Sequence, residues 1–337
     1  MPKWPDLAAG FKLLREVDLN AVRREAEAPV HIAVVGESGV GKSTLIRQLL
    51  SGPRDSEPAG IPPLSEHNIT DDIPLQAHSL VLLLLDAAKG THQPGQDVFT
   101  GLKKKKIPVV VCYNKADLAQ DTQAVMNGAQ LWPGVEVAAV AAYDAKSLQK
   151  MLVPAILRSC PGGEVRLARR LPLLREPVCQ KLVDDACFVN SAYSLTTGLA
   201  EINVFLDLPL NLADMVILTK NQALMAYKIS LAMGLPPDWR ETVPKLAAVV
   251  GSAFLWRQAA RQLVGLIPAY GVIPKIAVAY AGTYAVGQAI YQWCANGEKL
   301  KPEHLKSLYA SAFKRGREFA RVVLAKRKAL RAAGKQG

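Results

Sequence analysis

A stretch of nine residues, Gly36 to Thr44, has the residue types and the spacing of a phosphate-binding loop. It reads GESGVGKST and contains the pattern G-x-x-x-x-G-K-S. The glycines permit backbone conformations that a Cβ would forbid, so successive N–H groups can point at one phosphate. In such a loop Lys42 contacts the β- and γ-phosphates, and the Ser43 hydroxyl ligates Mg²⁺. The predicted contacts are Gly36, Ser38, Gly39, Val40, Gly41, Lys42, Ser43 and Thr44.

A second stretch, Asn114-Lys115-Ala116-Asp117, predicts which base accompanies the phosphates. A carboxylate at Asp117 can accept hydrogen bonds from N1–H and the exocyclic amine of guanine, a pair of donors that adenine lacks. We expect Asn114 to bond the purine edge and brace the phosphate loop, and the stem of Lys115 to pack along the base. The backbone N–H of Ala142 is the expected third contact. These residues predict binding of GTP and GDP.

The pattern around both stretches predicts the elements that position them. An apolar run at 31–35 precedes the glycine-rich loop, and a helix follows it from Lys42. Further apolar runs at 80–86, 108–113 and 135–140 have the length and composition of buried parallel strands, and they alternate with helical stretches at 96–105 and 146–157. The prediction is an α/β fold of the P-loop NTPase class with an open, mostly parallel sheet.

Residues of about 30 to 158 resemble the GTPase domain of the translation-factor-related class, and within it the Era/TrmE-like group. The segments that carry the resemblance are GESGVGKST, LVLLLLDA and NKAD. The resemblance implies a GTP-binding domain that uses Mg²⁺ and, where it is active, hydrolyses GTP.

The chain departs from this family where hydrolysis is controlled. Members carry a D-x-x-G motif whose Asp helps to hold Mg²⁺, but only 29 residues separate Leu50 from Leu80, which is short for two switches and two strands. The nearest remnant places Asp72 as the second Mg²⁺ partner, beside Ser43, and Lys42 and Asp72 are the catalytic candidates. Thr70 is the candidate threonine of the first switch. No arginine finger or water-orienting glutamine can be assigned, so the residues leave GTP hydrolysis open.

Four parts are predicted along the chain: an N-terminal amphipathic helix at 1–28, the GTP-binding domain at 29–160, a connector at 161–189 and a helical domain at 190–337. Expected helices in the last part lie at 192–205, 210–233, 240–266, 273–294 and 302–333. This half resembles a YcjF-like, membrane-associated helical domain through residues 206–214 and 279–287.

The distribution of charge along the sequence suggests a partner for the helical half. The formal charge is +12, and residues 299–337 carry 12 Lys and Arg against two Glu. Residues 272–290, with Lys275 as their one charge, have the length of a membrane span or of a helix buried in a soluble bundle. The basic helix after Pro302 favours an anionic membrane surface. An RNA or ribosome partner contacted through this helix and Lys103–Lys106 is the alternative, and a catalytically inactive GTP-binding scaffold is a third.

The five cysteines contain no C-x-x-C pair and no histidine at ligand spacing, so a zinc site is not expected. They are typical of free thiols in a reducing compartment. The first 19 residues lack the apolar core of a signal peptide. We therefore expect a cytoplasmic location, at the cytosolic face of a membrane.

Overall fold

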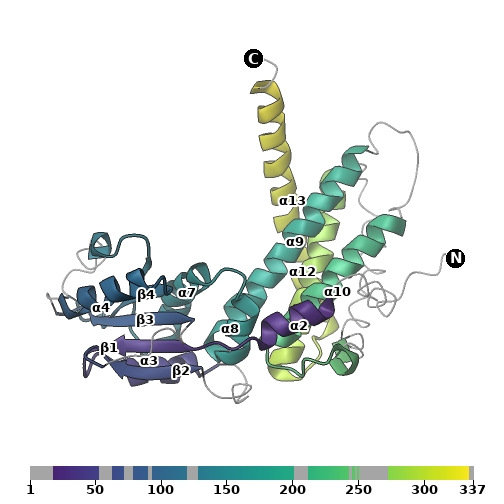
Figure 1. The fold of residues 1–337 in the computed structure, drawn as a ribbon. Helices are drawn as coiled ribbons and strands as arrows, with labels where there is room; N and C mark the ends of the chain where they lie inside the picture. Colours follow the sequence, from purple (N-terminus) through teal and green to yellow (C-terminus); the bar gives the residue numbers. More distant parts are fainter. Residues whose placement is uncertain are drawn as a thin grey trace. The chain divides into compact units, whose positions relative to one another are not determined.

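The structure, a computed structural model, describes residues 18–52, 63–71, 79–89, 93–119, 128–200, 212–242, 245–246, 249 and 272–333. The chain divides into two compact units (Figure 1). The first, here called the sheet unit, comprises Arg23–Val178 and Leu231–Gly234. The second, the helical unit, comprises Met1–Val22, Cys179–Ser230 and Leu235–Gly337.

Five parallel strands form the sheet in the order β2-β1-β3-β4-β5. Their bounds are β1 Ile32–Gly36, β2 Leu64–Asn68, β3 Leu80–Asp86, β4 Val109–Asn114 and β5 Glu136–Ala139. The predicted α/β fold with a parallel sheet is confirmed, and each predicted apolar run coincides with a strand. Because all strands run the same way, the loops after their carboxyl ends gather at one edge, which is where such sheets bind ligands.

Helices cover the sheet, so its strands can be apolar on both faces. The helices of this unit are α3 Lys42–Leu49, α4 Gln93–Lys104, α6 Ala145–Ser147, α7 Val153–Ser159 and α8 Glu164–Arg170, with a π-helical segment at Leu148–Leu152, and α2 Leu19–Glu27 precedes β1. Helix α3 packs on β1 and β2, α4 on β3, and α7 on β4 and β5. Every residue of β3 and β4 is buried, which explains their unbroken apolar sequences.

Strand β2 was not predicted from the sequence. It reads Leu-Ser-Glu-His-Asn and lies at the edge of the sheet, where all its residues are at least partly exposed. An edge strand of this kind does not need an apolar run, so the pattern that marks the other strands is missing. It pairs with β1 in register, with Glu66 opposite Val34.

Residues 161–189, predicted to be a connector, are largely helical. Helix α8 is followed by a 3-10 turn at Pro172–Leu174 and by α9, which runs from Arg175 to Ala200. Prolines stand at the first turns of two of these elements, with Pro172 opening the 3-10 turn and Pro177 near the start of α9. Proline is tolerated there because those N–H groups have no partner within the helix.

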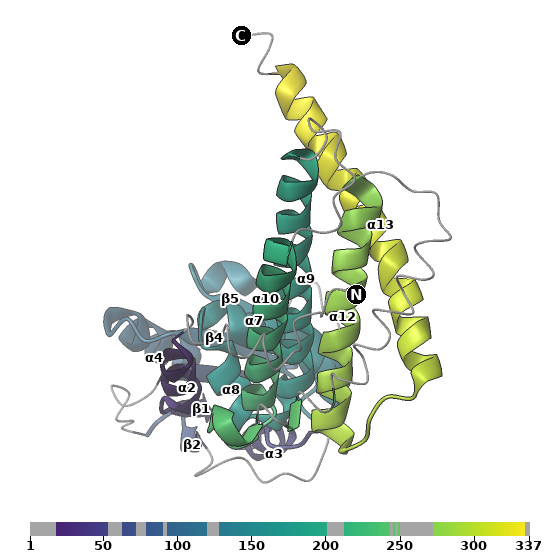
Figure 2. The same cartoon turned by 90° about the vertical axis from the view of Figure 1, so that its right-hand side faces the viewer.

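Among its described residues, the helical unit contains the remainder of α9 and three further long helices, α10 Leu212–Ala232, α12 Val272–Asn296 and α13 Pro302–Ala333. The predicted helices at 210–233, 273–294 and 302–333 match α10, α12 and α13, whereas most of the one predicted at 240–266 lies outside the described residues. Helices α12 and α13 pack along each other (Figure 2). A buried polar cluster of Asn190, Gln222 and Thr283 joins α9, α10 and α12.

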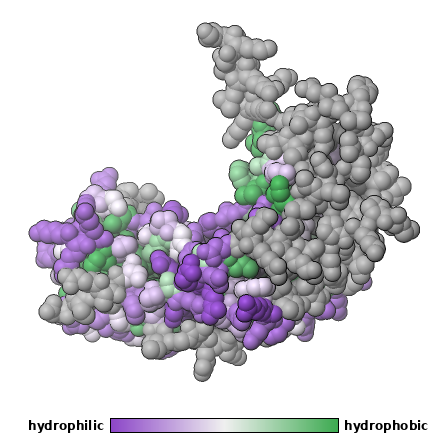
Figure 3. All heavy atoms as spheres, turned by 45° about the vertical axis from the view of Figure 1, so that its right-hand side comes forward, coloured by the Kyte–Doolittle hydropathy of each residue, from purple (hydrophilic) through white to green (hydrophobic). Residues whose placement is uncertain are grey.

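Within the described residues, none of the helices combines the length and apolar character that crossing a bilayer requires. Residues 272–290 belong to α12, so the membrane span that their composition allowed is not found there. On the face that Figure 3 shows, hydrophobic residues form small groups among hydrophilic ones.

Candidate functional site

The glycine-rich loop joins β1 to α3 in the conformation that its glycines were expected to permit. Gly36 ends β1, and Gly41 precedes the first residue of α3. Gly39 and Gly41 have φ angles of 73° and 99°, in the left-handed region that favours glycine. A Cβ at Gly41 would also collide with the side-chain amide of Asn114. The remaining predicted contacts are Ser38, exposed in the loop, Val40, buried beneath it, and Thr44, half-buried in the first turn of α3.

The Lys42 ammonium is held over the loop by the loop's own backbone. Nζ donates to the carbonyl oxygens of Gly36 at 3.0 Å and Glu37 at 2.9 Å, and the residue is only 7% exposed. These bonds keep a nearly buried cation beside the N-terminus of α3, which itself favours anions. The arrangement therefore concentrates positive potential where the loop turns.

The neighbouring Ser43 contacts a carboxylate that the sequence did not single out. Its hydroxyl donates to Oε2 of Glu66 on β2 at 2.9 Å, and Oε1 of the same carboxylate lies 3.9 Å from Nζ of Lys42. Nothing in the local sequence of Glu66 marks it as a site residue. The signal is the parallel pairing of β2 with β1, which places Glu66 beside the start of α3.

Asn114, at the end of β4, joins the phosphate loop to the loop after β5. Its Nδ2 donates to the carbonyl of Val40 at 2.8 Å, and its Oδ1 accepts from the N–H of Ala142 at 2.7 Å. The residue is 4% exposed, so both bonds are shielded from water. One side chain thus fixes the spacing of two segments that are predicted to contact opposite ends of a nucleotide.

Lys115 follows in a left-handed conformation, with φ 60°, and its Nζ donates to Oδ2 of Asp86 at 2.7 Å. Burial acts to raise the pKa of the Asp86 carboxyl. Hydrogen bonds from Lys115 and from the N–H of Ala88, with the charges of Lys115 and Lys89, outweigh it and leave that pKa below its usual value. An ion pair therefore links the ends of β3 and β4 and holds Lys115 at the carboxyl edge of the sheet.

Asp117 is exposed and accepts a hydrogen bond from the Tyr143 hydroxyl at 3.1 Å. The backbone of Tyr143 is tied to α3, because Gln48 Nε2 donates to its carbonyl at 3.1 Å. The hydrogen bond that the Tyr143 hydroxyl donates to Asp117, together with the charge of that carboxylate, raises the pKa of the hydroxyl, which stays protonated at neutral pH. Tyr143 is not among the predicted contacts, although its neighbour Ala142 is.

Two further predicted residues, Asp72 and Thr70, come from the segment that follows β2 in the sequence. Asp72, the proposed Mg²⁺ partner and catalytic candidate, lies outside the described residues. Thr70 lies in the turn after β2, next to Asp71, whose carboxylate accepts from the N–H of Asn68 at 2.6 Å.

The donors beside the loop fit Mg²⁺, which prefers oxygen ligands such as hydroxyl and carboxylate groups. Ser43 and Glu66 supply one of each. In the described part of the chain, no group of three or more His, Cys, Asp and Glu side chains could hold a metal. Mg²⁺ does not require one, since it is commonly bound by one or two protein oxygens together with phosphates and water. When bound, it would neutralise phosphate charge next to Lys42.

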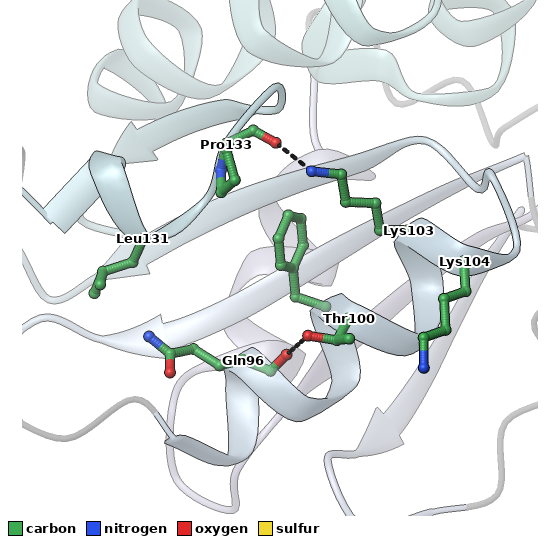
Figure 4. A pocket seen from close by; sticks show the side chains of 7 residues that line it. Gln96, Thr100, Lys103, Lys104, Leu131 and Pro133 are labelled. Carbon is green, nitrogen blue, oxygen red and sulfur yellow. Dashed lines mark hydrogen bonds between the residues drawn. The ribbon is translucent and has the colours of Figure 1, made fainter.

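A groove elsewhere on the sheet unit contains none of the predicted nucleotide contacts. It runs along α4, with Gln96, Thr100, Lys103, Lys104, Leu131 and Pro133 around it (Figure 4). Lys103 donates to the carbonyl of Pro133 at 3.2 Å and lies over the ring of Phe99. The run Lys103–Lys106 thus begins in the last turn of α4, and Lys103 makes contacts within the sheet unit.

Known proteins resemble part of this chain. No family model matches it. GTPase Era of Vibrio cholerae serotype O1 is 34% identical over 127 aligned residues, which cover 28% of this chain and 39% of Era. The uncharacterized protein MJ1339 of Methanocaldococcus jannaschii is 28% identical over 120 residues, covering 29% of this chain and 78% of that protein. The chain thus spans well under two thirds of the length of Era.

Among solved structures, a mutation variant of SsGBP aligns with a TM-score of 0.24 and 17% identity, over 42% of this chain and 58% of that one. A score this low carries no inference about the present chain.

Proposed function

We propose that this protein binds GTP and GDP with Mg²⁺ at the carboxyl edge of its sheet. The loop Gly36–Thr44 would hold the phosphates, and Asn114, Lys115 and Asp117 would hold the base, with the N–H of Ala142 nearby. Ser43 is the predicted Mg²⁺ ligand.

The observation that carries this proposal is the pair of bonds made by Asn114. They connect Val40 in the phosphate loop with Ala142 after β5, so one buried side chain joins segments that lie far apart in the sequence. A nucleotide needs such a connection, because its phosphates and its base must be held at a fixed separation. The partial likeness to Era, a GTPase by name, supports the same proposal.

Competition between nucleotides tests the proposal. A fluorescent GTP analogue should bind the wild-type chain and be displaced by GTP and GDP, with ATP far weaker because Asp117 cannot pair with adenine. Lys42→Ala should abolish binding, whereas Lys104→Ala, which removes an exposed lysine at the end of α4, should not. Equal competition by ATP, or undiminished binding by Lys42→Ala, would contradict the assignment. GTP turnover followed in the same samples shows whether binding leads to hydrolysis.

We further propose that the helical unit couples nucleotide binding to an anionic membrane surface. Helix α13 exposes the cations Lys314, Arg317 and Arg321 together with Val322, which is 53% exposed. On α9, Phe188 is 57% exposed, and its ring centroid lies 5.6 Å from that of Phe319 on α13. Cations beside exposed apolar side chains suit a surface of anionic head groups over acyl chains.

Vesicle co-sedimentation tests this second proposal. The chain should bind vesicles that contain anionic lipid and not neutral ones, with binding weakened by salt. Association with ribosomes and none with vesicles would instead favour the RNA alternative.

A further inference from the structure

We propose that Glu66 is the positioning carboxylate of the Mg²⁺ site, where it orients the hydroxyl of the predicted ligand Ser43. This inference rests on the proposed nucleotide function and names a residue that the loop pattern does not contain.

Glu66 reaches Ser43 from a different element. Strand β2 pairs in parallel with β1, and α3 packs against both, so the middle of β2 lies beside the first turn of α3. From there Oε2 of Glu66 accepts from the Ser43 hydroxyl at 2.9 Å. Backbone pairing therefore places the Cα of Glu66 within reach of Ser43.

The direction of this hydrogen bond is what a metal ligand needs. A serine hydroxyl has one hydrogen and two lone pairs. When the hydrogen is donated to Glu66, the lone pairs of Oγ point away from the carboxylate and stay available to a cation. A carboxylate that orients a ligand in this way also raises its basicity, as outer-shell partners do in other metal sites.

Other described carboxylates near the loop are engaged elsewhere. Glu37 accepts from Lys89 at 2.9 Å, and Asp71 accepts from the backbone of Asn68 at 2.6 Å. Of these three acids, Glu66 is the one whose carboxylate contacts the predicted metal ligand.

A competing role for Glu66 makes the opposite prediction. Its Oε1 lies 3.9 Å from the Lys42 ammonium, where a carboxylate could compete with phosphate for the cation. If competition were its main effect, removing the charge would strengthen nucleotide binding whether or not Mg²⁺ is present. If Glu66 positions Ser43, removing the charge weakens binding only when Mg²⁺ is present.

The test is the affinity of full-length chains for a fluorescent GTP analogue, measured in Mg²⁺ and in EDTA. For Glu66→Gln we expect the Mg²⁺-dependent gain in affinity to fall by about 10–100-fold, with the affinity in EDTA unchanged. Glu66→Asp should retain part of the gain. Asp97→Asn, an equal charge change on the exposed side of α4, should behave as wild type. Ser43→Ala should lose the gain, and adding Glu66→Gln to it should cost nothing more.

An independent readout is the affinity of the GDP complex for Mn²⁺, measured by electron paramagnetic resonance, which Glu66→Gln should lower. An undiminished Mg²⁺ gain in Glu66→Gln, or tighter binding in EDTA, would overturn the positioning role while leaving nucleotide binding intact. Failure of the wild-type chain to bind the GTP analogue would overturn the proposed function and this role together.

Discussion

At the scale of single residues, Tyr143 is hydrogen-bonded to the Asp117 carboxylate, the group on which guanine recognition would depend. Its hydroxyl donates to Oδ2 of Asp117, and both side chains are exposed. The carbonyl of Tyr143 is tied to Gln48, so the ring must swing about its own side-chain torsions to release the carboxylate. Guanine would have to replace this hydrogen bond with its own donors.

Tyr143→Phe should therefore bind GTP several-fold more tightly than wild type. The variant keeps the ring and loses only the competing hydroxyl. The gain in affinity should disappear in an Asp117→Asn background, where the carboxylate is already absent. Titration with a fluorescent GTP analogue measures the affinity of the single and the double variant. Weaker binding by Tyr143→Phe would mean that the hydroxyl assists the base.

The loop residues could be foreseen from the sequence because their chemistry is local. Gly41 and Lys42 act through backbone freedom and charge, which follow from residue type and spacing. Glu66 and Tyr143 could not be foreseen, because each meets its partner only through folding. One comes from an edge strand and the other from the turn after β5.

At the scale of elements, a buried polar cluster connects three helices of the helical unit. Thr283 Oγ1 accepts from Asn190 Nδ2 at 2.9 Å and from Gln222 Nε2 at 3.0 Å, and it donates to the carbonyl of Ala279 at 2.8 Å. All three side chains are at most 2% exposed. Such a cluster fixes which residues of α9, α10 and α12 face one another.

Thr283→Val should destabilise the helical unit. The substitution keeps the shape of the side chain but removes the acceptor of two buried amides, at a cost on the order of 1–3 kcal/mol for each unsatisfied group. Urea unfolding followed by circular dichroism should show a lower midpoint. Thr100→Val, which removes an exposed hydroxyl bonded to Gln96, is the matched control. Equal midpoints for the two variants would show that the cluster adjusts without cost.

Whether an element could be predicted depended on its burial. Strands β3 and β4 are buried on both faces, so unbroken apolar runs mark them in the sequence. Strand β2 is half-exposed and carries no such run. Helix α8 was missed for a different reason, since it is only seven residues long and lies in the segment predicted to be a connector.

At the scale of the whole molecule, positive charge is concentrated near the C-terminus. Residues 299–337 account for ten of the twelve net charges of the chain, from 12 basic and two acidic residues. The described part of this segment lies mostly on α13, which exposes many of its cations. Each Lys or Arg close to an anionic membrane contributes about 1 kcal/mol to binding.

Reversing two of these charges should release the chain from anionic vesicles. Arg317→Glu combined with Arg321→Glu changes the charge by four units on an exposed face of α13. The same change made at Lys146 and Lys150 in the sheet unit should leave vesicle binding intact. Co-sedimentation at low salt measures both double variants. Equal retention of the two on vesicles would refute a role for α13 at the membrane.

The pairing of β2 along one border of the sheet has a consequence for local stability. An edge strand has one neighbour, and such strands open more readily than central ones. If Ser43 and Glu66 act together only while β2 is paired, any ligand that needs both favours the closed form and stabilises it by mass action. A nucleotide bound at the phosphate loop would then slow hydrogen exchange at the backbone amides of β2. Exchange at this edge strand would therefore depend on whether the loop is occupied.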